Sequence, residues 1–150
     1  MSEPWQDPRA TLEAALSAIP YARFLAVRPE LHGDELTLVL PYAERLIGNP
    51  LLPALHGGVV GAFMELTAVA QLSVTAGPAS MGHLPKTIDI SIDYLRSGRP
   101  MDTFARARVV KVGRRIANCF VEAWQQERAQ PIASLRGHFL MRGAEDDTRP

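Results

Sequence analysis

The stretch LHGGVVGAFMELTAVAQL, residues 55–72, decides the fold. Its apolar residues continue around every side of a helix, which is typical of a helix buried inside a domain. Glu65 stands in the middle of this run. A buried carboxylate costs on the order of several kcal/mol unless it is paired or protonated. The sequence therefore predicts a buried central helix that keeps its glutamate for a functional reason.

Strand patterns follow this helix. The helix is expected to span residues 57–76, because Gly77 and Pro78 form a stop signal. Beyond them the chain alternates apolar and polar residues, as strands do. The expected strands are 86–96, 103–112, 115–127 and 131–141. In the first of these, one predicted face carries Ile88, Ile90, Ile92 and Tyr94, and the other carries Thr87, Asp89, Ser91 and Asp93, without a slip in the alternation.

The N-terminal part adds one helix and a hairpin. Asp7 and Pro8 start a short amphipathic helix, which Pro20 stops. Two alternating runs, 22–31 and 34–41, then predict a β-hairpin, and the glycine and prolines of the next fourteen residues predict a loop. The order of elements indicates an α+β fold, an antiparallel sheet with the long helix on its apolar face.

Length and composition limit the function classes. The 150 residues suit one domain. We expect a lead-in at 1–22, a core domain at 23–142 and a disordered tail at 143–150. Sixteen basic and sixteen acidic residues cancel, which gives no reason to expect nucleic acid or an anionic membrane as a partner. Cys119 is the only cysteine, which excludes an internal disulfide, and its strand pattern favours a core position.

Location is inferred from two further features of the sequence. The N-terminus lacks the basic and apolar regions of a secretion signal. The longest apolar run is broken by Glu65, Thr67 and Gln71 and is judged too short for a membrane span. We therefore expect a cytoplasmic protein.

One face of the long helix is lined with small residues around the glutamate. This face comprises Gly58, Gly61, Ala62, Glu65, Ala68 and Val69. Small residues let another helix or a ligand chain approach closely. The helix begins at Gly57 and Gly58, whose N–H groups lie at the positive end of the helix dipole and suit a carbonyl oxygen that gains negative charge. Together with a desolvated base, this is the minimum apparatus for acyl transfer.

Distance along the helix predicts a dimer. Gly58 and Glu65 are two turns apart, about 10 Å, so both cannot touch one reacting carbonyl. If two copies of the helix pack antiparallel along their small-residue faces, the glycine end of one meets the glutamate of the other. A homodimer with two equal sites follows.

The motifs resemble a known family. HGGVVGAFMELTAVAQL, TIDISIDYLRSGRP, VVKVGRRIANCFVEAW and PIASLRGHFLM are similar to the PaaI-like branch of the hotdog-fold acyl-CoA thioesterases, over about residues 36–141. The resemblance implies a sheet wrapped around the long helix, in a dimer or a dimer of dimers with sites at the subunit interface. Coenzyme A is implied as part of the substrate, and no metal or redox cofactor is needed.

Site residues are implied by the same resemblance. Glu65 of the neighbouring subunit acts as general base or nucleophile, and the Gly57 N–H polarises the thioester carbonyl. Asn49 helps to place the water or the carbonyl, and Thr87 orients the water. The residues expected to bind substrate are His56, Gly58, Gly113, Arg114 and Arg115, the last three at the CoA nucleotide. His56 has an alternative role, a hydrogen bond that fixes the loop before the helix.

The sequence departs from the family pattern at two points. The loop from Asn49 to His56 is one residue longer than usual and contains Pro53. Glu65 replaces the aspartate of many relatives, and its longer side chain favours activation of water over direct attack. The small-residue face implies a narrow acyl tunnel for short, medium or aryl acyl groups.

Other readings of the sequence stay open. A hotdog hydratase or dehydratase is one alternative, but it needs a histidine well upstream of the glutamate, and none occurs between His32 and His56. A non-catalytic acyl-CoA-binding module is another. The histidines His32, His83 and His138 show no metal-ligand spacing, so a zinc site is not expected.

Phe120 and Trp124 lie on one predicted strand face, and exposed aromatic side chains there suggest a further subunit contact that would make a tetramer.

Overall fold

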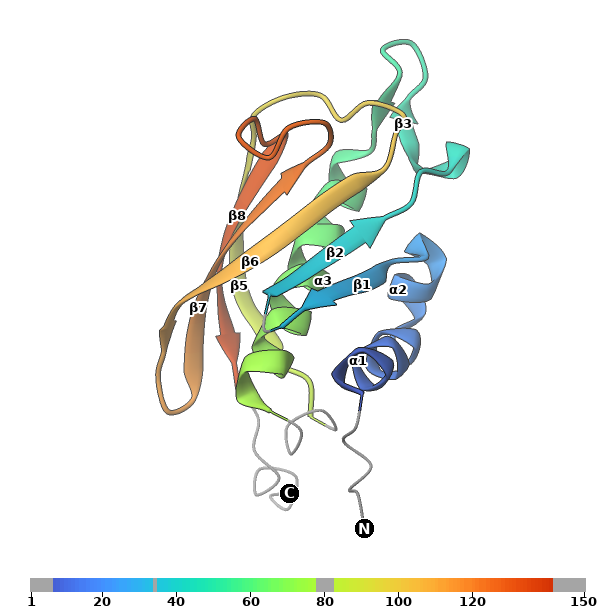
Figure 1. Ribbon diagram of the computed structural model, residues 1–150. Coiled ribbons are helices and arrows are strands. Elements are labelled where there is room, and N and C mark those ends of the chain that lie inside the picture. Colours follow the sequence, from blue (N-terminus) through green and yellow to red (C-terminus); the bar gives the residue numbers. More distant parts are fainter. Residues whose placement is uncertain (1–6, 34, 78–82, 142–150) are drawn as a thin grey trace.

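A curved antiparallel sheet wraps around one long helix (Figure 1). The computed structural model describes residues 7–33, 35–77 and 83–141. The elements are α1 (Pro8–Ser17), α2 (Pro20–Leu25), β1 (Arg28–His32), β2 (Glu35–Leu40), the 3-10 helix η1 (Glu44–Leu46), β3 (Ile47–Asn49), β4 (Ala54–Leu55), α3 (Gly57–Ala76), β5 (Lys86–Tyr94), β6 (Thr103–Val112), β7 (Ile116–Trp124) and β8 (Ala133–Leu140). The main sheet has the strand order β1-β2-β6-β7-β8-β5. The predicted α+β architecture, a hotdog arrangement, is confirmed.

Helix α3 forms the centre of the core. It spans the predicted residues and ends at Gly77, whose φ of 89° a glycine adopts without strain. Phe63, Met64 and Leu72 are fully buried against the concave side of the sheet.

The expectation that this apolar run is too short for a membrane span was wrong. By length and composition alone α3 could cross a membrane, although 67% of its most apolar stretch of 18 residues is buried inside this fold.

The N-terminal region differs from the prediction in one element. Asp7 caps α1 as expected, accepting the N–H of Arg9 at 3.0 Å. Residues 20–25, however, form helix α2 where the hairpin was expected to begin. Pro20 is preorganised for a first helical position, and helical spacing buries Ala22 and Leu25 on one side. The hairpin itself is confirmed, with a shorter first strand that starts at Arg28.

The segment before α3 was expected to be a loop and contains regular structure. Strands β3 and β4 pair, and the Asn49 side chain accepts the N–H of Leu51 at 3.0 Å to hold the turn between them. Gly48 allows His56 to lie directly against its backbone, because a Cβ at position 48 would be 2.7 Å from the His56 Cα. This close approach brings the start of α3 against the small hairpin.

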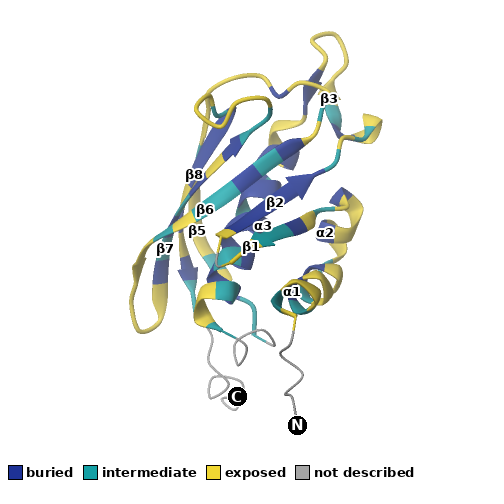
Figure 2. Cartoon of the chain, viewed as in Figure 1, coloured by how far each residue is buried: buried dark blue, intermediate teal, exposed yellow. Residues whose placement is uncertain are grey.

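Strand β5 forms one edge of the main sheet and contains a bulge. It pairs with β8, and no other described strand lies on its far side. Thr87 pairs with Phe139 and Asp89 with His138, so β5 has one extra residue between these pairs. The predicted alternation without a slip was therefore wrong. Figure 2 shows β5 as largely exposed, and Ile88 and Ile90 are 52% and 37% exposed.

Candidate functional site

The start of α3 presents one backbone N–H without a partner. His56 is the N-cap residue, and its Nδ1 accepts the N–H of Gly58 at 2.9 Å. The N–H groups of Gly57 and Gly58 were both expected to be available to a carbonyl oxygen, and for Gly58 this was wrong because the histidine side chain caps the helix. Among the residues that the structure describes, no acceptor lies within hydrogen-bond distance of the Gly57 N–H. Gly57 therefore presents the free donor at the positive end of the helix dipole.

Tyr94 holds the same glycine from the side. Its hydroxyl donates to the Gly57 carbonyl at 2.7 Å, across 37 residues of sequence. Sequence reasoning placed Tyr94 on the apolar face of its strand but did not connect it with the site. The only available signal was its register, because Tyr94 pairs with the buried Ala133 and so points to the helix side of the sheet.

The small-residue face of α3 is partly covered by β5. A Cβ at Gly61 would lie 2.8 Å from the Ile92 Cδ1, so this glycine makes room for the strand of its own chain. Ala68 and Val69 on the same face are also buried within the chain. At Gly61 the element that approaches closely is therefore a strand of the same chain, and not the other helix or ligand chain that was expected.

Glu65 lies on this face at the middle of α3. It is half-buried within one chain, less buried than predicted, because no described element covers it completely. Among the described residues it has no hydrogen bond or ion pair. α3 is unbroken, so eight residues, about 12 Å, separate Glu65 from Gly57. One chain thus keeps the free N–H and the carboxylate apart.

Asn49 and Thr87 approach the helix from different elements. Asn49 is exposed on β3, and its Oδ1 is occupied by the turn that it holds. Thr87 is half-buried opposite Phe139, a core residue. Since directly paired residues point to the same side of a sheet, the bulge turns Thr87 toward the helix side, away from the outer face of Asp89. The expectation that Thr87 shares a polar face with Asp89 was wrong.

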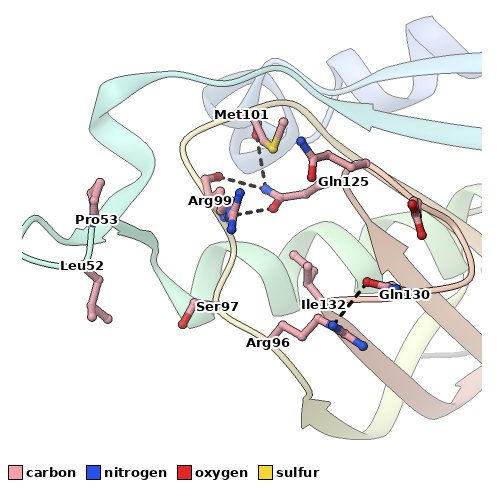
Figure 3. Close-up of a pocket in the computed structure, with 11 residues that line it drawn as sticks. Leu52, Pro53, Arg96, Ser97, Arg99, Met101, Gln125, Gln130 and Ile132 are labelled. Atoms are coloured by element: carbon pink, nitrogen blue, oxygen red, sulfur yellow. Dashed lines mark hydrogen bonds between the residues drawn. The ribbon is translucent and has the colours of Figure 1, made fainter.

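Two cavities adjoin the Gly57 end of α3. The first, of about 390 Å³, is lined by Gly57, Tyr94, the segment 95–98 and apolar residues of neighbouring elements. The second, of about 500 Å³, shares Arg96, Ser97 and Ile132 with it and adds Arg99 (Figure 3). Gln125 holds the Arg99 backbone through two hydrogen bonds of 2.9 Å, one to its N–H and one to its carbonyl. The pair of cavities leads from a free N–H donor to two arginines.

The turn 113–115 lies at the other end of the sheet (Figure 1). The Arg115 carbonyl accepts the N–H of Met141 at 2.6 Å, beside the Lys86 end of β5. The Gly57 end of α3 contacts Tyr94, eight residues farther along β5, roughly 26 Å away at about 3.3 Å per residue. Within one chain the structure does not bring Gly113, Arg114 and Arg115 to Gly57.

The outer face of the sheet carries aromatic and basic side chains. Phe120 is half-buried between Arg108 and Arg136, whose guanidinium carbons lie 5.5 and 6.0 Å from its ring centroid. Trp124 stacks with Phe104 and contacts Arg128. These rings are thus partly covered within the chain, and the predicted tetramer stays a prediction.

Cys119 is a core residue, as its strand pattern predicted. It is 2% exposed, and burial raises the pKa of its thiol from 9.0 to about 11. The thiol is therefore protonated near neutral pH and unsuited to nucleophilic attack. Within residues 7–33, 35–77 and 83–141, no cluster of three or more histidine, cysteine, aspartate or glutamate side chains could hold a metal ion.

Comparison with known proteins identifies relatives of this chain. Residues 52–132, more than half of the chain, match the model of the thioesterase superfamily. The medium/long-chain acyl-CoA thioesterase YigI of Escherichia coli is 25% identical over 138 residues, 82% of this chain and 86% of that protein.

Solved structures share the fold. A protein of Chromobacterium violaceum is 35% identical, with a TM-score of 0.70, over 91% of this chain and 93% of that chain. A phenylacetic acid degradation-related protein of Ralstonia eutropha is 19% identical, with a TM-score of 0.71, over 87% of this chain and 98% of that one, which shows a shared fold. The predicted enzyme class, a thioester hydrolase, is confirmed, and this chain belongs to the thioesterase superfamily.

Proposed function

We propose that the chain hydrolyses acyl-CoA to a free acid and CoA. The observation that carries this proposal is the unpartnered Gly57 N–H beside a cavity, about 12 Å from the half-buried carboxylate of Glu65. The N–H stabilises the negative charge that develops on the thioester oxygen. Glu65 takes a proton from water as the water oxygen attacks the carbonyl carbon. The carbon–sulfur bond then breaks, and the proton passes to the departing CoA thiolate.

The site is assembled from two subunits in this proposal. The helix keeps Gly57 and Glu65 of one chain too far apart to act on one carbonyl, so the carboxylate comes from the partner. The free edge of β5 supports this arrangement, because an exposed edge with large apolar side chains favours pairing with a second strand. Antiparallel pairing of two β5 strands would set the Lys86 end of one against the Tyr94 end of the other. The partner's 113–115 turn would then lie near the Gly57 end.

Thr87 and Asn49 orient the water in this proposal. Thr87 points to the helix side of β5, toward the face of α3 that carries Glu65. Asn49 retains its amide N–H groups for this role, because the turn uses only its Oδ1. Asn49 thus comes from the chain whose Gly57 holds the carbonyl, whereas Thr87, seven residues before Tyr94 on β5, comes with Glu65 from the partner.

The CoA moiety has a candidate path beside Gly57. Arg96 and Arg99 line the larger cavity, and arginine forks bind phosphate oxygens well. The acyl group lies along the part of the small-residue face that stays half-buried, at Ala62 and Glu65, while Ile92 and Tyr94 take up space at Gly61. We therefore propose short, medium or aryl acyl groups as substrates.

The first experiment measures release of CoA thiol from a panel of short, medium, long and aryl acyl-CoAs. Glu65→Gln should lower kcat by orders of magnitude and leave KM near its wild-type value, because the amide cannot accept the proton. Glu30→Gln is the matched control, a half-buried glutamate on β1 at the opposite edge of the sheet. A panel without turnover, but with measurable acyl-CoA binding, would refute hydrolysis and favour the binding module.

Subunit mixing tests the shared site directly. Gly57→Pro removes the N–H and Glu65→Gln removes the base, so each homodimer should be inactive. In a mixed dimer one site receives both wild-type groups and the other receives neither. Random mixing makes half of the dimers mixed, and about a quarter of the wild-type activity should return. If a single chain supplies both groups, mixing will restore nothing.

A further inference from the structure

The contact between Tyr94 and Gly57 is not a consequence of core burial. Tyr94 is 56% exposed, yet its hydroxyl donates to the Gly57 carbonyl at 2.7 Å instead of pointing into water. A Cβ at Gly57 would lie 3.4 Å from the Tyr94 ring and hydroxyl, so the ring rests on the glycine in ordinary van der Waals contact. The phenol thus lies directly against residue 57, and even a Cβ there would make only an ordinary contact with it.

Gly57 has no side chain of its own to fix its backbone, unlike the preceding His56. Two hydrogen bonds fix His56: its backbone N–H donates to the Leu46 carbonyl at 2.9 Å, and its ring Nδ1 accepts the Gly58 N–H at 2.9 Å. Gly57 has no side chain, and glycine has the widest backbone freedom of any residue. The Tyr94 hydroxyl is the side-chain group that holds Gly57 itself.

We propose that Tyr94 is a positioning residue, which orders Gly57 so that its N–H points at the thioester carbonyl. This inference rests on the hydrolysis proposed above. The same side chain lines the cavity of about 390 Å³ beside Gly57, and its hydroxyl oxygen lies 3.4 Å from the Cβ position of Gly61, so the ring also forms a wall of the substrate groove. Tyr94 thereby joins the proposed oxyanion donor of α3 to the edge strand β5.

The test separates the hydroxyl from the ring. Tyr94→Phe keeps the wall and removes only the hydrogen bond. We expect kcat to fall about 3- to 10-fold, with KM within about twofold of wild type and an unchanged order of preference among acyl groups. Tyr21→Phe is the matched control, because Tyr21 is an exposed tyrosine on α2 that stacks on Phe24. Its kinetics should equal those of the wild type.

A second measurement works without substrate. In an α-helix the amide of Gly61 pairs with the Gly57 carbonyl, the acceptor of the Tyr94 hydroxyl. Loss of the hydroxyl should speed hydrogen exchange of the Gly61 amide about 3- to 10-fold and leave amides near the helix end unchanged.

The outcomes distinguish the two proposals. Faster exchange together with a lower kcat supports the positioning role. Unchanged kcat in Tyr94→Phe overturns it, whether or not exchange at Gly61 changes. A raised KM at constant kcat also overturns it, because the hydroxyl would then serve substrate binding. Absence of turnover in the wild type refutes the hydrolysis itself, and the exchange rates then decide only whether Tyr94 orders the helix start.

Discussion

Replacing Gly57 with proline removes the proposed oxyanion donor and little else. Position 57 is the first residue of α3, where proline fits because the N–H has no partner inside the helix. His56 has φ −62° and ψ 130°, the extended conformation that a residue before proline prefers. The nearest atoms to a Cβ at this position belong to Tyr94, at 3.4 Å, which is an ordinary contact. The substitution should therefore leave the fold intact.

The expected loss is that of one oxyanion donor. Removing such a donor costs about 10²- to 10³-fold in kcat, roughly 2.7 to 4 kcal/mol. The free energy of unfolding should change by less than about 1 kcal/mol, since proline at a compatible position also restricts the unfolded chain. The assay is steady-state release of CoA thiol, with thermal unfolding measured on the same preparation.

Gly57→Ala is the matched variant, because it adds a Cβ and keeps the N–H. Its kcat should stay within about tenfold of wild type, well above that of the proline variant. If folded Gly57→Pro and Gly57→Ala show equal kcat values, the Gly57 N–H does not stabilise the transition state, and the reasoning from the free donor is refuted.

Three further predictions concern parts of the molecule outside this donor. Gly48→Ala should lower the free energy of unfolding by about 1 to 3 kcal/mol and reduce kcat, because a Cβ 2.7 Å from the His56 Cα must displace the helix cap. An unchanged melting temperature would contradict this prediction. The pKa of the Cys119 thiol is about 11 in the folded chain and 9.0 for an ordinary thiol, so the unfolded chain loses this proton first as the pH rises. Between pH 9 and 11 the free energy of unfolding of the wild type should therefore fall by up to about 2 to 3 kcal/mol more than that of Cys119→Ala. Equal losses in both proteins, measured by urea unfolding, would refute this prediction. The double variant Arg114→Ala and Arg115→Ala should raise KM for acyl-CoA about tenfold and leave KM for the matching acyl-pantetheine unchanged, because acyl-pantetheine lacks the nucleotide. Equal effects on both substrates would show that the turn does not bind the nucleotide.

The long helix and the last three strands could be predicted because their signals are local. A run of apolar residues that ends at Gly77 and Pro78 defines α3, and period-two alternation defines β6, β7 and β8. Helix α2 escaped prediction because Ala22, Phe24 and Ala26 alternate with other residues as in a strand. The buried residues follow helical spacing instead, and the first-turn preference of Pro20 decided the outcome.

The site was only partly predictable for a different reason. The glycine start and the glutamate of α3 stand in one segment, so the spacing on which the proposed second chain rests follows from helix geometry. The Tyr94 contact with Gly57 and the approach of His56 to Gly48 join distant or folded-back segments, and no local pattern encodes them. The extra residue in β5 also leaves the hydrophobic pattern almost undisturbed, which is why the side faced by Thr87 was predicted wrongly.

The bulge in β5 makes the number of residues in this strand as important as their identity. Thr87 faces the helix only because one residue of β5 has no counterpart in β8. Deleting Ile88 would join Thr87 directly to Asp89 and restore a regular ladder, in which Thr87 still pairs with Phe139 on the helix side. A regular ladder that kept Ile88 would instead turn Thr87 to the outer side, so the strand would keep its composition and lose the orientation of a hydroxyl. Homologues with a regular strand of the same length at this point are therefore not interchangeable templates for designing a new specificity.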